Sequence, residues 1–205
     1  MKRKVTAATR TPNVPHTINS RTFHITSQPI IHPTMASVKG KDKQEYIQAT
    51  QLIRTHPEQA IAILRNLAAK YPTALPVQYN LIMALMANNE DQEADARTIE
   101  LYQQHPDYFF AKILYAEYCL IHDHLQEIPK IFSNVWDPKL LYPHRDTFHI
   151  SEITAFVGTC GLFFYSIGEM NLAHEYLEYL IKVAPNHFQT NRLKYILFPE
   201  PEMML

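Results

Sequence analysis

A 15-residue segment that occurs three times decides the fold: EQAIAILRNLAAKYP at residues 58–72, QEADARTIELYQQHP at 92–106 and NLAHEYLEYLIKVAP at 171–185. Each copy has an alanine at its third residue and a proline at its last, 12 residues further on. Ala60 and Ala94 are 34 residues apart, as are Pro72 and Pro106, and Ala173 lies 79 residues beyond Ala94. A small side chain lets two helices approach closely, and a proline stops the second helix. The repetition predicts a stack of helix pairs.

This pattern resembles the tetratricopeptide repeat (TPR), a 34-residue pair of antiparallel helices. The second helix of that family carries a small residue, two apolar residues and a closing proline, matched here by Ala60, Leu64, Leu67 and Pro72, by Ala94, Leu101 and Pro106, and by Ala173, Leu177, Leu180 and Pro185. Thr98 departs from the pattern. Gly161 and Phe164 match the first helix of the last repeat, where the first two repeats have Gln48 and Ile82 instead of glycine. The resemblance implies an all-α, TPR-like superhelix, a right-handed solenoid of helix pairs.

The repeats are expected near residues 41–74, 75–108, 109–142 and 154–187. The third is degenerate, because Ile128 replaces the small residue and Pro129 follows it, so its second helix is either kinked or begins at Pro129. An insertion reaching to about residue 150 carries the single tryptophan, Trp136, and is expected to form a structured loop or short helix packed on the solenoid. A capping helix ends the solenoid at residue 198, before a tail at 199–205. The helical period predicts helices at 42–55, 57–71, 74–88, 91–104, 108–122, 124–134, 150–167, 169–183 and 187–197.

The N-terminal part of the chain differs in composition from the rest. Seven of the 19 Lys and Arg residues lie within residues 1–41, which contain no Asp or Glu. We interpret residues 1–40, which are rich in Thr, Ser and Pro, as a disordered basic tail preceding an acidic body. Such a tail could contact nucleic acid, an anionic membrane or the body itself. Two alternatives stay open, namely an organelle transit peptide and a chain that starts at Met35.

Several classes of function find no support in the sequence. Cys119 and Cys160 lie in apolar helical runs and are predicted to be buried free thiols. The absence of a long apolar run and of an export signal predicts no membrane span and a cytoplasmic location. No phosphate loop, dinucleotide fingerprint or catalytic triad is recognisable, so we expect no enzyme activity, cofactor or metal. Specific nucleic-acid binding is not expected either, because the basic tail lacks interleaved aromatic residues.

The resemblance to TPR proteins implies a protein-interaction scaffold or adaptor, since first helices in that family line a concave groove. Projected onto this chain, the expected partner-binding residues are Tyr79, Met83, Met86, Phe110, Ile113 and Glu117. Burial of the same residues in the core is the open alternative. Some TPR proteins grip acidic C-terminal tails with basic and amide side chains. This chain offers Asn80, but Glu45, Phe110 and Leu114 occupy other positions of that clamp, so an apolar or weakly basic helix or extended peptide is the expected partner.

Two rival hypotheses accompany the groove. The first is a small-molecule or metal-dependent activity centred on residues 134–152, around Trp136, His144, Arg145 and His149. His144, His149 and Glu152 could converge there if the insertion folds back, although a polar loop in which Ser151 or Asp146 caps the next helix explains them as well. The second rival is a self-associating scaffold. His122-Asp123-His124 is interpreted as a pair of helix caps, because residues two apart on a helix point to different sides.

Overall fold

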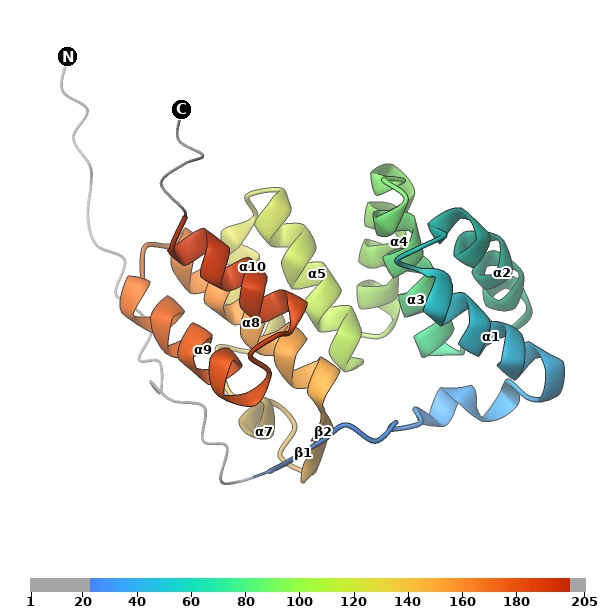
Figure 1. The fold of residues 1–205 in the computed structure, drawn as a ribbon, viewed down its shortest axis with the longest axis horizontal. Helices are drawn as coiled ribbons and strands as arrows, with labels where there is room; N and C mark the ends of the chain where they lie inside the picture. The colour runs from blue at the N-terminus through green and yellow to red at the C-terminus, as the bar shows by residue number, and fades with distance from the viewer. Residues whose placement is uncertain (1–22, 200–205) are drawn as a thin grey trace, which may run out of the picture. The chain divides into compact units, whose positions relative to one another are not determined.

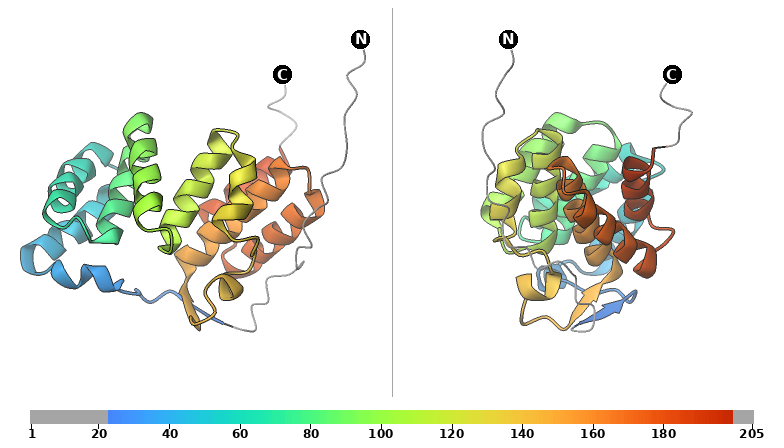
Figure 2. Two further views of the ribbon diagram at one scale, coloured as in Figure 1. Left: turned by 180° about the vertical axis from the view of Figure 1, so that it is seen from behind. Right: turned by 90° about the vertical axis from the view of Figure 1, so that its left-hand side faces the viewer.

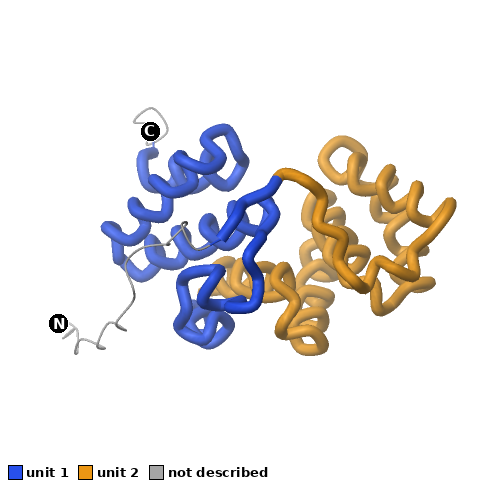
Figure 3. Tube along the Cα trace, turned by 90° about the horizontal axis from the view of Figure 1, so that it is seen from below, with its two compact units in different colours: residues 1–26, 124–205 blue, residues 27–123 orange. Residues whose placement is uncertain are grey.

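The computed structural model describes residues 23–199, and this part of the chain is mainly helical (Figure 1). It divides into two compact units, coloured separately in Figure 3. Unit 2 is residues 27–123, and the described part of unit 1 is residues 23–26 and 124–199. The chain therefore passes from unit 1 into unit 2 after Thr26 and returns after Asp123.

Unit 2 consists of helices that each pack on the next one along the chain. Its elements are the 3-10 helix η2 (Pro33–Ser37) and the α-helices α1 (Gly40–Leu52), α2 (Pro57–Lys70), α3 (Leu75–Ala87), α4 (Asp91–Gln104) and α5 (Phe109–Ile121). The predicted helices are confirmed, with ends that agree within three residues. Their core is aliphatic, and Ala60 and Ala94 are buried in it as the repeat predicts. Thr98, the departure from the repeat, is fully buried, and its hydroxyl finds no hydrogen-bond partner within residues 23–199.

Unit 1 is built around the longest of the described helices. Its elements are the strand β1 (His24–Thr26), the 3-10 helix η3 (Leu125–Glu127), the short helices α6 (Ile128–Ile131) and α7 (Pro138–Leu141), the strand β2 (Thr147–His149), and the helices α8 (Ile150–Ser166), α9 (Met170–Val183) and α10 (Phe188–Leu197). Helix α8 packs against both α9 and α10. Ala173 is buried, which confirms the third alanine of the repeat.

Gly161 permits the close packing of α8. A Cβ atom at this position would clash with Leu193 Cδ2 and lie 3.3 Å from Tyr176 Cβ. Cys160, beside it, is buried, as is Cys119, and the two form no disulfide, as the sequence predicts. Burial raises the pKa of the Cys160 thiol well above its ordinary value, which keeps it protonated.

The insertion packs within unit 1 through its tryptophan. The Trp136 ring stacks on Phe163 with centroids 5.0 Å apart, and the Tyr176 hydroxyl donates a 2.7 Å hydrogen bond to the Trp136 carbonyl. Of the two alternatives for Pro129, a kinked helix and a helix that begins near this proline, the structure shows the second. The 3-10 helix η3 leads into α6, and Pro129 lies in the first turn of α6. A proline is tolerated there because that turn has no internal acceptor for its missing N–H.

The expectation of a disordered tail through residue 40 is wrong for residues 23–40. β1 lies beside β2 (Figure 2). The two strands pair in parallel, with His24 opposite Thr147 and Thr26 opposite His149. Phe23 and Val38 are buried, and η2 contacts α3. Composition failed here because a few apolar anchors dock against residues far away in sequence, where a local average of polarity cannot detect them. This small sheet also corrects the all-α prediction to a mainly helical fold. Residues 1–22 and 200–205 lie outside the described part, and with them most of the predicted tails.

The prediction that the chain has no membrane span can be compared with the lengths and apolar character of the described helices. Within residues 23–199, no helix combines the length and the apolar character that crossing a bilayer requires.

Candidate functional site

The residues predicted to bind a partner lie on two helices of unit 2. They are Tyr79, Met83 and Met86 on α3, and Phe110, Ile113 and Glu117 on α5. On each helix their spacing places them on one side. The rings of Tyr79 and Phe110 meet with centroids 4.5 Å apart, so the fold brings the two rows together. These six residues are called the α3–α5 face below.

The apolar members of the α3–α5 face are not equally buried. Ile113 is buried. Tyr79, Met83, Met86 and Phe110 are partly buried and pack against the aliphatic core of unit 2. Each of these four side chains therefore supports the core with part of its surface and keeps another part accessible.

The polar groups of the face lie in an environment of reduced polarity. Burial, followed by the Glu117 carboxylate and then by Tyr46, raises the pKa of Tyr79 well above its ordinary value. Burial also raises the pKa of Tyr46. The Glu117 carboxylate adds negative potential to an otherwise apolar surface.

Asn80, the one residue that matches a carboxylate clamp, is occupied within unit 2. Its Nδ2 donates hydrogen bonds of 2.9 Å to the Tyr46 hydroxyl and 2.8 Å to the Pro76 carbonyl. The Tyr46 bond joins α1 to α3, so this amide positions the helices.

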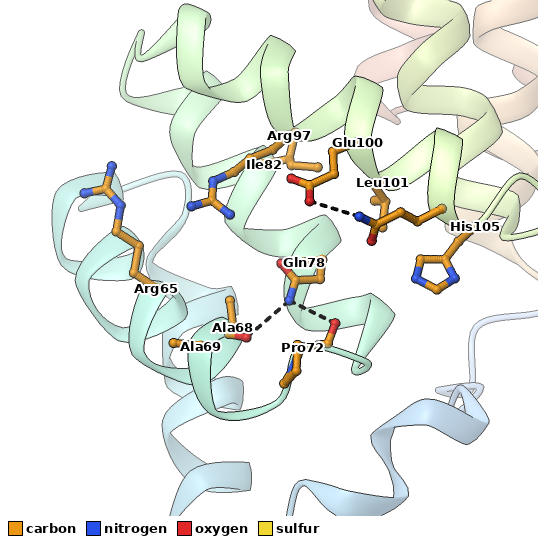
Figure 4. Close-up of a pocket in the computed structure, with 11 residues that line it drawn as sticks. Arg65, Ala68, Ala69, Pro72, Gln78, Ile82, Arg97, Glu100, Leu101 and His105 are labelled. Atoms are coloured by element: carbon orange, nitrogen blue, oxygen red, sulfur yellow. Dashed lines mark hydrogen bonds between the residues drawn. The ribbon is translucent and has the colours of Figure 1, made fainter.

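A pocket elsewhere on unit 2 was not anticipated from the sequence. It has a volume of about 360 Å³ and is formed by α2, α3, α4 and the residues that follow α2 and α4 (Figure 4). Its lining residues are Arg65, Ala68, Ala69, Pro72, Gln78, Ile82, Arg97, Glu100, Leu101, Gln104 and His105. The volume is at the lower end of the range for small-molecule sites. The lining combines small apolar side chains with charged and amide groups.

The charged groups beside the pocket neutralise one another. Glu93 accepts from Arg65 at 2.5 Å and from Arg97 at 2.7 Å, and Arg65 also reaches Glu90 at 2.9 Å. Hydrogen bonds from Arg97 and then Arg65 lower the pKa of Glu93. The ion pair of Glu93 and Arg97 could be predicted from the sequence, because the two residues lie four apart on one helix. The ion pair of Arg65 and Glu93 could not, because Arg65 lies on α2 and Glu93 on α4.

The remaining polar side chains of the pocket also bond locally. Gln104 Nε2 donates to Glu100 Oε1 at 3.0 Å, and Gln78 Nε2 points at the carbonyls of Ala68 and Pro72, at 3.4 and 3.3 Å (Figure 4). These bonds hold the rim in place and arrange no pair of nucleophile and base.

The residues of the rival site in the insertion organise the start of α8. Arg145 donates to Glu152 through two bonds of 3.0 and 2.7 Å, and Glu152 accepts from the backbone N–H of His149 at 2.9 Å. The His149 ring in turn accepts from the Ser151 N–H, which completes a capping box. His149 and Glu152 thus come together at the start of α8, and His149 is its N-terminal cap instead of Ser151 or Asp146, the caps expected from the sequence, whereas His144 is exposed. Within residues 23–199, no cluster of three or more His, Cys, Asp or Glu side chains has an arrangement suited to a metal ion.

The His122-Asp123-His124 triplet lies between helices, as predicted. His122 is the C-terminal cap of α5 and His124 precedes η3. The His122 ring also contacts Asp95 on α4 at 2.8 Å.

Comparisons with protein-family models, with curated proteins and with solved structures found no match for this chain. The assignment to the TPR family therefore stays a prediction from the repeat pattern.

Proposed function

We propose that this chain is a protein-interaction module of the TPR type, without catalytic activity of its own. Its binding surface is the α3–α5 face of unit 2, and its partner is a protein segment with apolar side chains and at least one basic residue. In this proposal the helix pairs continue into the right-handed superhelix that the repeat resembles.

The observation that carries the proposal is the half-buried state of Tyr79, Met83, Met86 and Phe110 on neighbouring helices. Side chains fixed on one side by a core lose little conformational freedom when a partner covers the other side. Aromatic rings are frequent anchors of interfaces, and methionine adapts its shape to irregular surfaces. The combination favours a binding surface over a simple extension of the core.

Glu117 supplies the polar part of the specificity. A carboxylate bordering an apolar surface favours a lysine or arginine on the partner, and it disfavours an acidic tail. Glu45 on α1 is a second acidic group on a first helix, although it pairs with Lys41 at 3.3 Å. The engagement of Asn80 within unit 2 agrees with this preference, because that amide already has bonding partners. An amphipathic, weakly basic helix or extended peptide fits these features.

The test compares two double variants in a quantitative pull-down from the cells that make this protein. Tyr79→Ala/Phe110→Ala removes two rings from the α3–α5 face. Tyr195→Ala/Phe198→Ala, the matched control, removes two exposed rings from α10 and the residue after it. We expect the first variant to lose at least ~10-fold in partner recovery, since removing one interface anchor typically costs 2 kcal/mol or more. The control should retain its partners.

Circular dichroism must first show that both variants are folded. Equal recovery by wild type and a folded Tyr79→Ala/Phe110→Ala variant would refute the assignment of this face. A further variant, Glu117→Lys, is expected to weaken capture of a basic partner, because it replaces an attraction with a repulsion.

A further inference from the structure

The first described residues of the chain form an arm that docks on unit 1. The arm is Phe23–Thr26, and its strand β1 lies in register on β2. The His24 N–H donates to the Asp146 carbonyl at 2.8 Å. Phe23 is only 6% exposed and meets the Phe148 ring edge-on, with centroids 5.3 Å apart. A few backbone bonds and one aromatic anchor therefore attach the arm.

The surface that receives the arm is organised by residues of the insertion and of α8. We call residues 146–149, with Arg145 and Glu152 behind them, the slot. The Arg145 guanidinium lies over the Phe148 ring at 4.3 Å and bonds to Glu152. Lys139 pairs with Asp146 at 2.6 Å. These interactions are made among residues 139–152, so the slot has internal support that does not depend on which arm occupies it.

The segment that joins the arm to unit 2 is exposed. Residues 27–31, the hinge, are all exposed and have no regular secondary structure. Gln28 precedes Pro29 and His32 precedes Pro33, and a residue before proline is biased toward extended backbone. His32 is extended, with φ −66° and ψ 137°. The hinge also presents two large apolar side chains, because Ile30 is 46% exposed and Ile31 is 71% exposed.

We propose that the slot also receives the arm of a second copy of this chain, so that two copies exchange arms reciprocally. The arm makes the same contacts with the slot of its own copy and with that of a second copy. The equilibrium between the monomer and the dimer with exchanged arms therefore depends on the hinge and on the protein concentration. In a two-fold dimer the hinges pass each other, and equal residues become neighbours. Ile30 and Ile31 of the two copies then bury each other, which favours a second copy over an unrelated peptide. This proposal stands independently of the α3–α5 face.

The test is a disulfide cross-link between variants that carry one new cysteine each. His24→Cys and Thr147→Cys change aligned residues of β1 and β2 whose native side chains are exposed. A chain with both changes should form the disulfide within one copy, because paired strand residues fall in the ~4.4–6.8 Å Cα range that a disulfide needs. A mixture of the two single variants can form this bond only between copies. Cys119 and Cys160 are buried and do not compete.

We expect the mixture at ~1 mM protein to give several-fold more cross-linked heterodimer than at ~10 µM, since a short tether gives an effective concentration on the order of mM. The control mixture combines His24→Cys with Asn171→Cys, another exposed position. A heterodimer yield no higher than in this control, while the double variant cross-links within one copy, would overturn the exchange. A double variant that does not cross-link would overturn the docking of the arm itself.

The role of the hinge has its own variant. Ile30→Ser/Ile31→Ser should lower the heterodimer yield and leave the cross-link within one copy unchanged, because only the dimer buries these side chains. An unchanged heterodimer yield would contradict the choice of a second copy as the occupant of the slot.

Discussion

In unit 1 aromatic rings form the centre of the packing, whereas in unit 2 most of them lie at its margin. The rings of Phe132, Trp136, Phe156, Phe163, Phe164 and Tyr176 contact one another in unit 1 and are all buried. The core of unit 2 consists mostly of Ala, Val, Leu and Ile, with Tyr108 and Phe109 as its buried rings, and Tyr46, Tyr71, Tyr79 and Phe110 are partly buried around it.

This difference shows where a binding surface can be placed on a helix-pair fold. A ring that is enclosed on all sides contributes to stability and cannot reach a partner. A ring that rests on an aliphatic core has a supported position and a free side, so it can contribute to both. The same residue types therefore have different roles in the two units, and their composition alone does not reveal which role applies.

The largest expected effect comes from removing an equivalent ring from each unit. Phe164→Ala in unit 1 should lower the free energy of unfolding by about 3–5 kcal/mol, because it leaves a cavity in a closed core. Phe110→Ala in unit 2 should cost only about 1–2 kcal/mol, since that ring is partly exposed and less apolar area is lost. Urea unfolding followed by circular dichroism measures both changes. Equal losses would remove the distinction between enclosed and marginal rings.

A smaller effect is expected where unit 1 packs most tightly. Gly161→Ala should destabilise by roughly 1–2 kcal/mol, because overpacking against Leu193 exceeds the better helix propensity of alanine. In a Leu193→Ala background the same change should cost less, since the clash with Leu193 is gone and the 3.3 Å contact with Tyr176 Cβ remains. Gln48→Ala, at the equivalent and exposed repeat position in unit 2, should change stability by less than about 0.5 kcal/mol. Thermal unfolding of the four variants tests this, and an unchanged cost without Leu193 would contradict the assigned clash.

The smallest effect concerns the pH dependence of stability. The pKa of Tyr79 in unit 2 and that of Tyr176 in unit 1 are both raised, in each case mainly by burial. Between the ordinary tyrosine pKa of 10.0 and these raised values, the folded chain holds more protons than the unfolded chain. The free energy of unfolding therefore falls as pH rises above ~10.

Tyr79→Phe and Tyr176→Phe should each make this alkaline decline shallower, as followed by the melting temperature from pH 8 to about 11. At neutral pH, Tyr176→Phe should cost more than Tyr79→Phe, because it removes the hydrogen bond to the Trp136 carbonyl. A decline as steep in Tyr79→Phe as in wild type would show that the Tyr79 phenol is more accessible than its contacts indicate.

Much of the helical fold could be predicted, because it depends on local pattern. The alanines and prolines of the repeat located the helices, and Ala60, Ala94 and Ala173 are buried as expected. The candidate site was predicted less completely. Helical spacing identified the residues of the α3–α5 face, but not that Ile113 is buried while Tyr79 and Phe110 stay partly accessible. The degree of burial depends on neighbouring helices, which periodicity within one helix does not describe.

The sequence by itself determined the helical segments, the buried small residues that let helices touch, and the burial of two cysteines that form no disulfide. These features follow from the 3.6-residue period and from side-chain size, which act over a few residues. Only the tertiary structure decided that the arm pairs with β2, that Arg65 joins Glu93 and Arg97 beside a pocket, and that Arg145 and Glu152 brace the start of α8. Each of these contacts either joins groups far apart along the chain or forms where no regular period exists, so its energy is gained only after the helices have packed.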